Sequence, residues 1–332
     1  MALLGLVGIT TPAHGREPII DMHLHARAVS GPGAPPLCTP FEVMPRWNQT
    51  KPLPEGLEDN RPPCAKPVAP AATTEQAMIQ TIEVMNRRNI IGMVSGEPAL
   101  MKLWLRAAPD RIIPGSDLRL PGTPGHNHTA PRSIDELRKL HAGGELKVLG
   151  EVMAQYEGVD ANDPRLEPYF ALAEELDIPV AFHLGTGEPG TPYGPDPAYR
   201  AGAGSPLQLE PVLLRHPKMR IYVMHAGYPF AADMRALMFS HPQVYVDVGS
   251  IVYAEPRPAF YRFLQEIVEA GYGDRVLFGS DQMIWPGVIE PAIESIQNAP
   301  FLSEQQKRDI LYNNAARFLR LSPEEIARHH AM

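Results

Sequence analysis

The chain has 332 residues, of which 44% are hydrophobic, enough apolar material for one large barrel or two modest domains. Its formal net charge of −8 and the lack of a basic run argue against nucleic acid or an anionic membrane surface as the main partner. An apolar stretch of transmembrane length is also missing from the sequence. We therefore expect a globular protein that acts on a small molecule. The sequence does not exclude assembly into a homo-oligomer.

The first fifteen residues resemble the back half of an export signal. An apolar stretch, Ala2–Ile9, precedes Ala13-His14-Gly15, a small-x-small pattern typical of a signal-peptidase site, but no Lys or Arg comes before it. We expect residues 1–15 to be the remnant of an export signal and the protein to be periplasmic or secreted. The alternative is a disordered or misassigned start of a cytoplasmic protein.

Short apolar runs alternate with amphipathic helical patterns from Ile19 onward. Such a run is typical of a strand buried on both faces, as in a parallel sheet. Eight runs, each followed by a helical pattern, predict an α/β fold in which a (β/α)8 TIM barrel forms one domain over residues 16–332. The runs lie near residues 18–24, 90–95, 111–116, 147–152, 178–184, 220–225, 243–249 and 275–281.

Several helix starts can be read from the sequence. The apolar spacing predicts a helix over residues 74–89, and Ser133 with Glu136 predicts a capping box at the start of another. Asp163-Pro164 predicts a helix that runs to about Asp177. Prolines mark further starts at Ser205-Pro206, Pro258 and Pro286-Gly287.

One connection is much longer than the others. Residues 27–72 follow the first strand and contain eleven prolines, Trp47 and both cysteines of the chain, with little periodicity. Long loops in compact domains are usually functional or disordered. We expect this segment to cover the barrel mouth, with a floppy surface insertion as the alternative. An even cysteine count in an exported protein predicts a disulfide between Cys38 and Cys64, whereas two free thiols would fit a cytosolic enzyme.

Five of the apolar runs end in residues able to bind a metal, at the strand ends where parallel barrels carry their chemistry. His23 and His25 alternate along one strand, so both project to the same side and can share a divalent cation. A pair with the same spacing, His126-Asn127-His128, lies among prolines and glycines with no strand before it, so we interpret it as ordinary loop residues. The other candidate ligands are Glu151, His183, His225 and Asp281.

The two acids of this set are the hardest to explain without a metal. A carboxylate such as Glu151 or Asp281 at the end of a buried apolar run costs a large desolvation energy unless a cation offsets it. The combination of acids and histidines therefore predicts a metal centre. Zinc suits these mixed nitrogen and oxygen ligands best, with manganese or iron as alternatives.

The same residues give the chain a resemblance to a known family. His23-x-His25, Glu151, His183, His225 in Met-His-Ala-Gly and Asp281 in Phe-Gly-Ser-Asp resemble the amidohydrolase superfamily, in particular its amidohydrolase-2 branch of hydrolases and decarboxylases. The resemblance covers nearly the whole chain, down to the late helix at residues 310–318. It implies that one metal is held by His23, His25 and Asp281 and a second, if present, by His183 and His225.

Glu151 is the position that discriminates between reaction types. In two-metal members of the superfamily a carboxylate, usually a carboxylated lysine, bridges both ions from the fourth strand, and a smaller subset uses glutamate. Many decarboxylases of the branch resemble single-metal enzymes without an acid there. The resemblance therefore favours a binuclear hydrolase of a small carboxylic ester, lactone, amide or phosphoester, with Asp281 as the base.

Two alternatives remain at this point. The first is a non-oxidative decarboxylase of a small unsaturated or aromatic acid, in which His225 acts as the acid or base. The second is a barrel that binds a ligand without turnover, which the complete ligand set disfavours. We expect Asp21 and Asp247 to support the centre or to be ordinary buried barrel residues. Substrate contacts are expected from residues just past the strand ends, namely Arg27, Gln155, Tyr156, Tyr228, Tyr253, Gln282 and Trp285.

Overall fold

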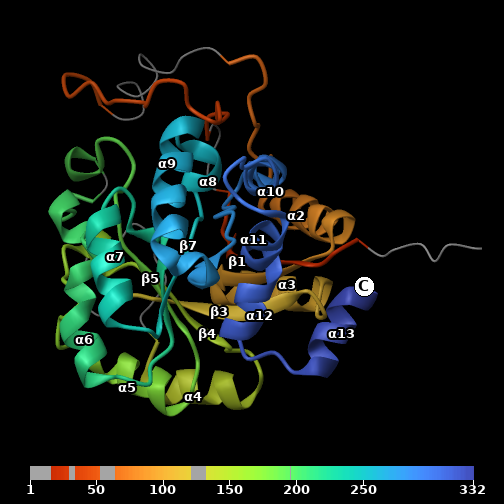
Figure 1. Cartoon of the computed structure of the whole chain (residues 1–332), viewed down its shortest axis with the longest axis vertical. Coiled ribbons are helices and arrows are strands. Elements are labelled where there is room, and N and C mark those ends of the chain that lie inside the picture. Colours follow the sequence, from red (N-terminus) through yellow and green to blue (C-terminus); the bar gives the residue numbers. More distant parts are fainter. Residues whose placement is uncertain (1–15, 30–33, 53–63, 121–131, 195) are drawn as a thin grey trace, which may run out of the picture.

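Eight parallel strands form the centre of the computed structural model, which describes residues 16–29, 34–52, 64–120, 132–194 and 196–332 (Figure 1). Each strand pairs with the next along the chain, in the order β1 to β8. The predicted apolar runs supply them, because buried Ile, Val and Leu fill both faces. Their bounds are β1 Ile19–Ala26, β2 Ile90–Gly96, β3 Ile112–Leu118, β4 Val148–Val152, β5 Val180–His183, β6 Ile221–Met224, β7 Val244–Asp247 and β8 Val276–Leu277.

Hydrogen bonds between the first and last strand regions close the sheet. The amide of Met22 donates to the carbonyl of Phe278 at 2.9 Å, and the amide of His25 donates to the carbonyl of Gln282 at 2.9 Å. Leu24 and Gln282 also form a parallel bridge. The predicted α/β barrel is confirmed.

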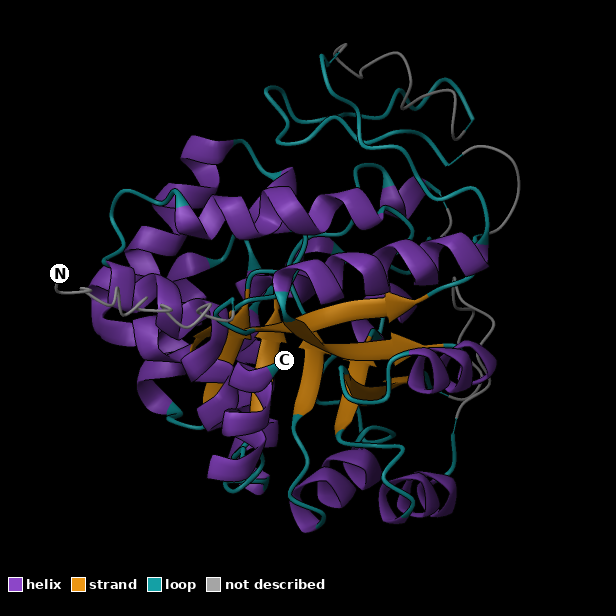
Figure 2. Cartoon of the chain, turned by 90° about the vertical axis from the view of Figure 1, so that its right-hand side faces the viewer, coloured by secondary structure: helices purple, strands orange, loops and turns teal. Residues whose placement is uncertain are grey.

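Helices surround the strands (Figure 2). Each of the first seven strands is followed in the chain by at least one helix, as a right-handed parallel barrel requires. The helices are α2 Thr74–Arg88, α3 Pro98–Ala107, α4 Ile134–Ala142, α5 Glu167–Glu175, α6 Glu210–Arg215, α7 Ala231–Ser240, α8 Ile251–Ala254, α9 Arg257–Ile267, α10 Ile289–Gln297, α11 Glu304–Arg308, α12 Asn314–Phe318 and α13 Pro323–Ala331.

Two local predictions about helix starts need correction. Helix α5 begins at Glu167 rather than at Pro164, because the amide of Leu166 closes a turn onto the carbonyl of Asp163 before the helix starts. At α4, Ser133 accepts a hydrogen bond from the amide of Glu136, but the Glu136 carboxylate pairs with Arg132. The predicted capping box is therefore only half formed.

The buried apolar side chains form two packed clusters. One cluster takes alternate residues of the strands, including Ile20, Met22, Met93 and Tyr222, and adds Phe318 of α12. The larger cluster lies between the strands and the helices. Because side chains alternate across a strand, the first cluster fills the barrel interior below the strand ends.

The Pro-rich segment contacts three loops that follow barrel strands. Within the segment, Leu37 and Val68 form an antiparallel bridge, and Cys38 and Cys64 are joined by a disulfide. The hydroxyl of Thr39 donates to the carbonyl of Tyr253, while Trp47 packs its ring 5.6 Å from that of Tyr193. The indole of Trp285 donates to the carbonyl of Pro35. Figure 1 shows the segment, in red and orange, beside α8 and α9.

Two further expectations concern other parts of the chain. The predicted export remnant, residues 1–15, and the pair His126 and His128 lie outside the described residues. None of the described helices combines the length and the apolar character that a membrane span needs.

The buried face of α9 gives a test of the fold. Phe260 is fully buried, so Phe260→Ala should lower the free energy of unfolding by about 3–5 kcal/mol through lost burial and a residual cavity. Phe239 of α7 is 83% exposed, so Phe239→Ala should change the free energy of unfolding by less than about 0.5 kcal/mol. Urea denaturation of both variants measures the difference, and equal losses would contradict this packing.

Candidate metal centre

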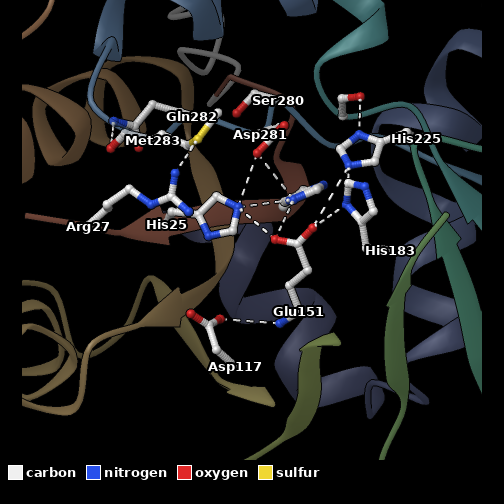
Figure 3. Close-up of polar contacts among 12 residues, drawn as sticks. His25, Arg27, Asp117, Glu151, His183, His225, Ser280, Asp281, Gln282 and Met283 are labelled. Atoms are coloured by element: carbon white, nitrogen blue, oxygen red, sulfur yellow. Dashed lines mark hydrogen bonds and ion pairs between the residues drawn. The ribbon is translucent and has the colours of Figure 1, made fainter. Parts of the chain in front are cut away.

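The six predicted ligands converge at the carboxyl ends of the strands. Figure 3 labels five of them, His25, Glu151, His183, His225 and Asp281. All six are buried, with residue exposures of 8% or less. They come from five of the eight strand regions, so only the closed barrel brings them together. His23 and His25 lie on β1, Glu151 lies on β4, His183 ends β5, and His225 and Asp281 follow β6 and β8.

The first group of ligand atoms has the spacing of a tetrahedral metal site. The Nε2 atoms of His23 and His25 are 3.1 Å apart, and they lie 3.3 and 3.1 Å from Oδ1 of Asp281. Ligands at about 2.0–2.1 Å from a tetrahedral zinc ion are about 3.3 Å from one another. The three side chains therefore fit a divalent metal without rearrangement of the backbone.

A second group lies across Glu151. Oε1 of Glu151 is 2.6 Å from Nδ1 of His183, and that nitrogen is 3.1 Å from Nε2 of His225. The other carboxylate oxygen, Oε2, faces the first group and is 3.5 Å from Nε2 of His25. Glu151 thus directs one oxygen at each group of ligands.

Hydrogen bonds alone do not satisfy this cluster. Two neutral imidazoles whose nitrogens face each other share a single proton, and facing nitrogens occur in both groups. Burial lowers the pKa of His23, but the carboxylates of Asp281 and Asp247 outweigh it and raise that pKa to about 10. The surplus of negative charge that holds a proton there equally favours a divalent cation. The donor atoms, their spacing and the surrounding charge all fit a divalent cation.

The backbone of two ligands is held in an uncommon conformation. His225 has φ 57° and Asp281 has φ 54°, and Ala226 after His225 has φ 50°. Non-glycine residues in this left-handed region cost energy and persist where the surrounding structure fixes them. The amide of Asp281 donates to the carbonyl of His23 at 2.7 Å, which ties two ligands together through the backbone.

Both candidate supporting acids contact the ligand segments. Oδ1 of Asp21 accepts hydrogen bonds from the amides of His23 and Ser280. Oδ1 of Asp247 accepts them from the amides of His225 and Gly249. Each carboxylate joins the chain around one ligand to another strand end.

Three of the candidate substrate contacts lie at the cluster. Arg27 comes directly after β1, two residues past His25, and its Nη1 donates to the sulfur of Met283, a weak acceptor, at 2.9 Å. Tyr156 packs its ring 4.7 Å from that of His183. Tyr253 is buried, and its burial, together with the charge of Asp281, raises its pKa. Both rings stay phenols at neutral pH, because burial likewise raises the pKa of Tyr156.

The remaining candidates make contacts with other loops. The side-chain amide of Gln155 donates to the carbonyl of Gly185, and the hydroxyl of Tyr228 donates to the carboxylate of Glu255. The side-chain amide of Gln282 donates to the carbonyl of Met283, and the Trp285 indole is used by the Pro-rich segment. These contacts organise the loops at the barrel mouth rather than the candidate ligands.

Sequence reasoning missed two residues that touch ligands. Oδ1 of Asp117 accepts a hydrogen bond from the amide of Glu151 at 3.3 Å, and the carbonyl of Gly249 lies 2.9 Å from Nδ1 of His225. Asp117 lies near the end of the third strand, so the strand-end criterion could have identified it. Gly249 acts through its backbone, and no side-chain pattern reveals that.

The fold and the cluster define a class: an enzyme built on a TIM barrel, with histidines and carboxylates suited to a divalent metal at the strand ends. The family model described as Amidohydrolase (Amidohydro_2) matches residues 20–321. The chain belongs to the amidohydrolase family, and the predicted resemblance is confirmed.

Solved structures show the same fold at low identity. A probable 2-pyrone-4,6-dicarboxylic acid hydrolase from Acinetobacter baumannii is 16% identical, with a TM-score of 0.56 over 91% of this chain and 99% of that chain. A 4-oxalomesaconate hydratase from Rhodopseudomonas palustris is 17% identical, with a TM-score of 0.54 over 91% and 95%. A 2,6-dihydroxybenzoate decarboxylase is 14% identical, with a TM-score of 0.53 over 92% and 100%.

One curated protein matches part of the chain. Protein fluG of Emericella nidulans is 24% identical over an alignment of 135 residues, and the match covers 36% of this chain. The match spans only 16% of that protein's length.

Removing metal with a chelator and then adding zinc tests whether this cluster binds a metal. Zinc added to chelator-treated protein at about a hundredfold excess over its Kd should raise the free energy of unfolding by about 2.7 kcal/mol, because zinc binds the folded state. His25→Ala should lose most of this gain. His330→Ala, at an exposed position in α13, should keep it. Thermal unfolding with and without zinc measures the gain, and equal gains in both variants would exclude His25 as a ligand.

Proposed function

We propose that the protein is a metal-dependent hydrolase with two divalent ions bridged by Glu151. The observation that supports this most directly is the direction of the two Glu151 oxygens. Oε1 faces His183 and His225, while Oε2 faces His25 and His23. In this proposal His23, His25 and Asp281 hold one ion and His183 and His225 hold the other. Zinc suits these ligands best.

Bound metals would supply the Lewis acidity that makes water nucleophilic near neutral pH and polarises a substrate carbonyl or phosphoryl oxygen. The protein's own part is the movement of the proton. Oδ1 of Asp281 is directed at the two β1 histidines, so Oδ2 is the oxygen free to accept a proton from water and return it to the leaving group. Because Asp281 is buried in the barrel mouth, bulk water does not compete with it for this proton.

The proposed substrate is a small carboxylic ester, lactone, amide or phosphoester. Arg27 supports an anionic substituent on it, because no carboxylate among the described residues pairs with its guanidinium. The phenols of Tyr156 and Tyr253 can donate to a polar substituent. The name of the Acinetobacter baumannii relative, a probable hydrolase of a dicarboxylic acid, agrees with this substrate class.

The Pro-rich segment would cover this site. Its contacts with Tyr193, Tyr253 and Trp285 attach it to the loops after β5, β7 and β8. The Cys38–Cys64 disulfide supports a protein that works in an oxidising compartment, so we propose a periplasmic or secreted enzyme.

A decarboxylase is the second candidate function, and the 2,6-dihydroxybenzoate decarboxylase among the structural relatives favours it. In that reaction His225 would deliver the proton that replaces the carboxyl group. Burial, together with the neighbouring His183, lowers the pKa of His225, so a protonated His225 would give up its proton more readily than free imidazolium.

Variants of Glu151 discriminate between the two functions. Glu151→Ala should reduce metal content from two equivalents to one or none. It should also slow ester or lactone hydrolysis by at least about a hundredfold, since a Lewis-acidic metal stabilises the transition state by several kcal/mol. Glu145→Ala, at an exposed position near the opposite end of the barrel, is the matched control. Elemental analysis and product assays give the answer. One equivalent of metal retained in Glu151→Ala, with carbon dioxide released from an acid substrate, would establish the decarboxylase instead.

A further inference from the structure

Asp247 lies behind the ligands, between the two groups. It ends β7 and is fully buried. Its Oδ1 accepts hydrogen bonds from the amides of His225, at 3.0 Å, and Gly249, at 2.8 Å. Its Oδ2 lies 3.1 Å from Nδ1 of His23. Among the described residues neither Oδ2 of Asp247 nor Nδ1 of His23 has a hydrogen-bonding partner elsewhere.

A carboxylate oxygen only accepts hydrogen bonds, so it determines where the ring proton of His23 resides. With the proton on Nδ1, the contact to Asp247 is favourable and the lone pair of Nε2 points at His25 and Asp281. With the proton on Nε2, two lone pairs would oppose each other at Nδ1 and a hydrogen would occupy the metal position.

The same carboxylate acts on His225 through Gly249. The carbonyl of Gly249 lies 2.9 Å from Nδ1 of His225, so it also requires the proton on Nδ1 and leaves Nε2 directed at His183. Asp247 holds both the amide of Gly249 and the amide of His225. One side chain thus orients a histidine in each of the two ligand groups.

Two glycines prevent the His23 ring from moving away. A Cβ on Gly249 would lie 2.4 Å from Nδ1 of His23, and one on Gly279 would lie 2.8 Å from Cβ of His23. A larger residue at position 249 would collide with the ring, and one at position 279 would collide with the Cβ atom that carries it. The backbone therefore encloses the ring on the side that faces Asp247, which leaves the ring proton as the main remaining freedom.

We propose that Asp247 is a positioning residue that fixes the Nδ1-protonated form of His23 and, through Gly249, that of His225, and so sets metal affinity at both groups. The proposal rests on the metal centre of the proposed function.

Asp247→Asn is the decisive variant. The amide oxygen can keep both backbone hydrogen bonds, which places the amide NH2 against Nδ1 of His23. That NH2 donates, so it favours a proton on Nε2, where the metal should bind. Zinc affinity, measured by competition with a chelator, should fall about 10–100-fold. Ring 15N spectra of the zinc-loaded wild type should show His23 bound through Nε2 with a protected proton on Nδ1, and this signature should be lost in the variant.

Asp21→Asn is the matched control. Asp21 is an equally buried carboxylate near His23, but it contacts the backbone amide of His23 and not the ring. Asp21→Asn should leave the His23 ring signature in place, because Asp21 does not contact the ring. If Asp21→Asn loses the ring signature as Asp247→Asn does, nearby charge explains the effect and the role of Asp247 is overturned.

The wild type alone can also overturn the proposal. Zinc-loaded protein in which His23 binds through Nδ1 contradicts it, even if Asp247→Asn fails to fold. These measurements use no substrate, so a chain that binds zinc as described but hydrolyses nothing refutes the hydrolase and leaves the role of Asp247 standing.

Discussion

Buried negative charge at the strand ends is the constraint on which the rest of the site depends. Glu151 and Asp281 lie out of water, and an uncompensated carboxylate in such a place costs several kcal/mol. The facing imidazoles offset this only in part, because they compete for the same protons. A divalent cation would complete the charge balance, and only the closed barrel brings together the residues that would hold it. The apolar layer beneath, with Met22, Met93 and Tyr222, is free to provide stability.

The sequence was most informative where one physical rule acted alone. The strands could be predicted because a strand buried on both faces must be apolar throughout, and the eight runs matched the eight strands closely. The convergence of the candidate ligands could be predicted because parallel strands place their carboxyl ends on one face. Their convergence follows from closure of the barrel, so His23 and Asp281 could be grouped although they lie near opposite ends of the chain.

The rest depended on competition that a sequence does not display. Glu136 could complete a capping box or pair with Arg132, and the ion pair formed. Asp163 could begin a helix or close a turn, and the turn came first. Gly249 contributes a carbonyl, which every residue type carries, so its contact with His225 leaves no mark on the sequence. Side chains such as Gln155 point along loops whose paths depend on tertiary packing.

Closure of the barrel also has a consequence for the order of folding. The backbone hydrogen bond from Asp281 to His23 belongs both to the seam between the first and last strands and to the ligand cluster. Contacts between distant parts of a chain form slowly, because loop closure costs entropy before any packing is gained. Full affinity for a metal would therefore arise only after the last strand docks, and metal uptake during refolding would report the moment at which the seam closes.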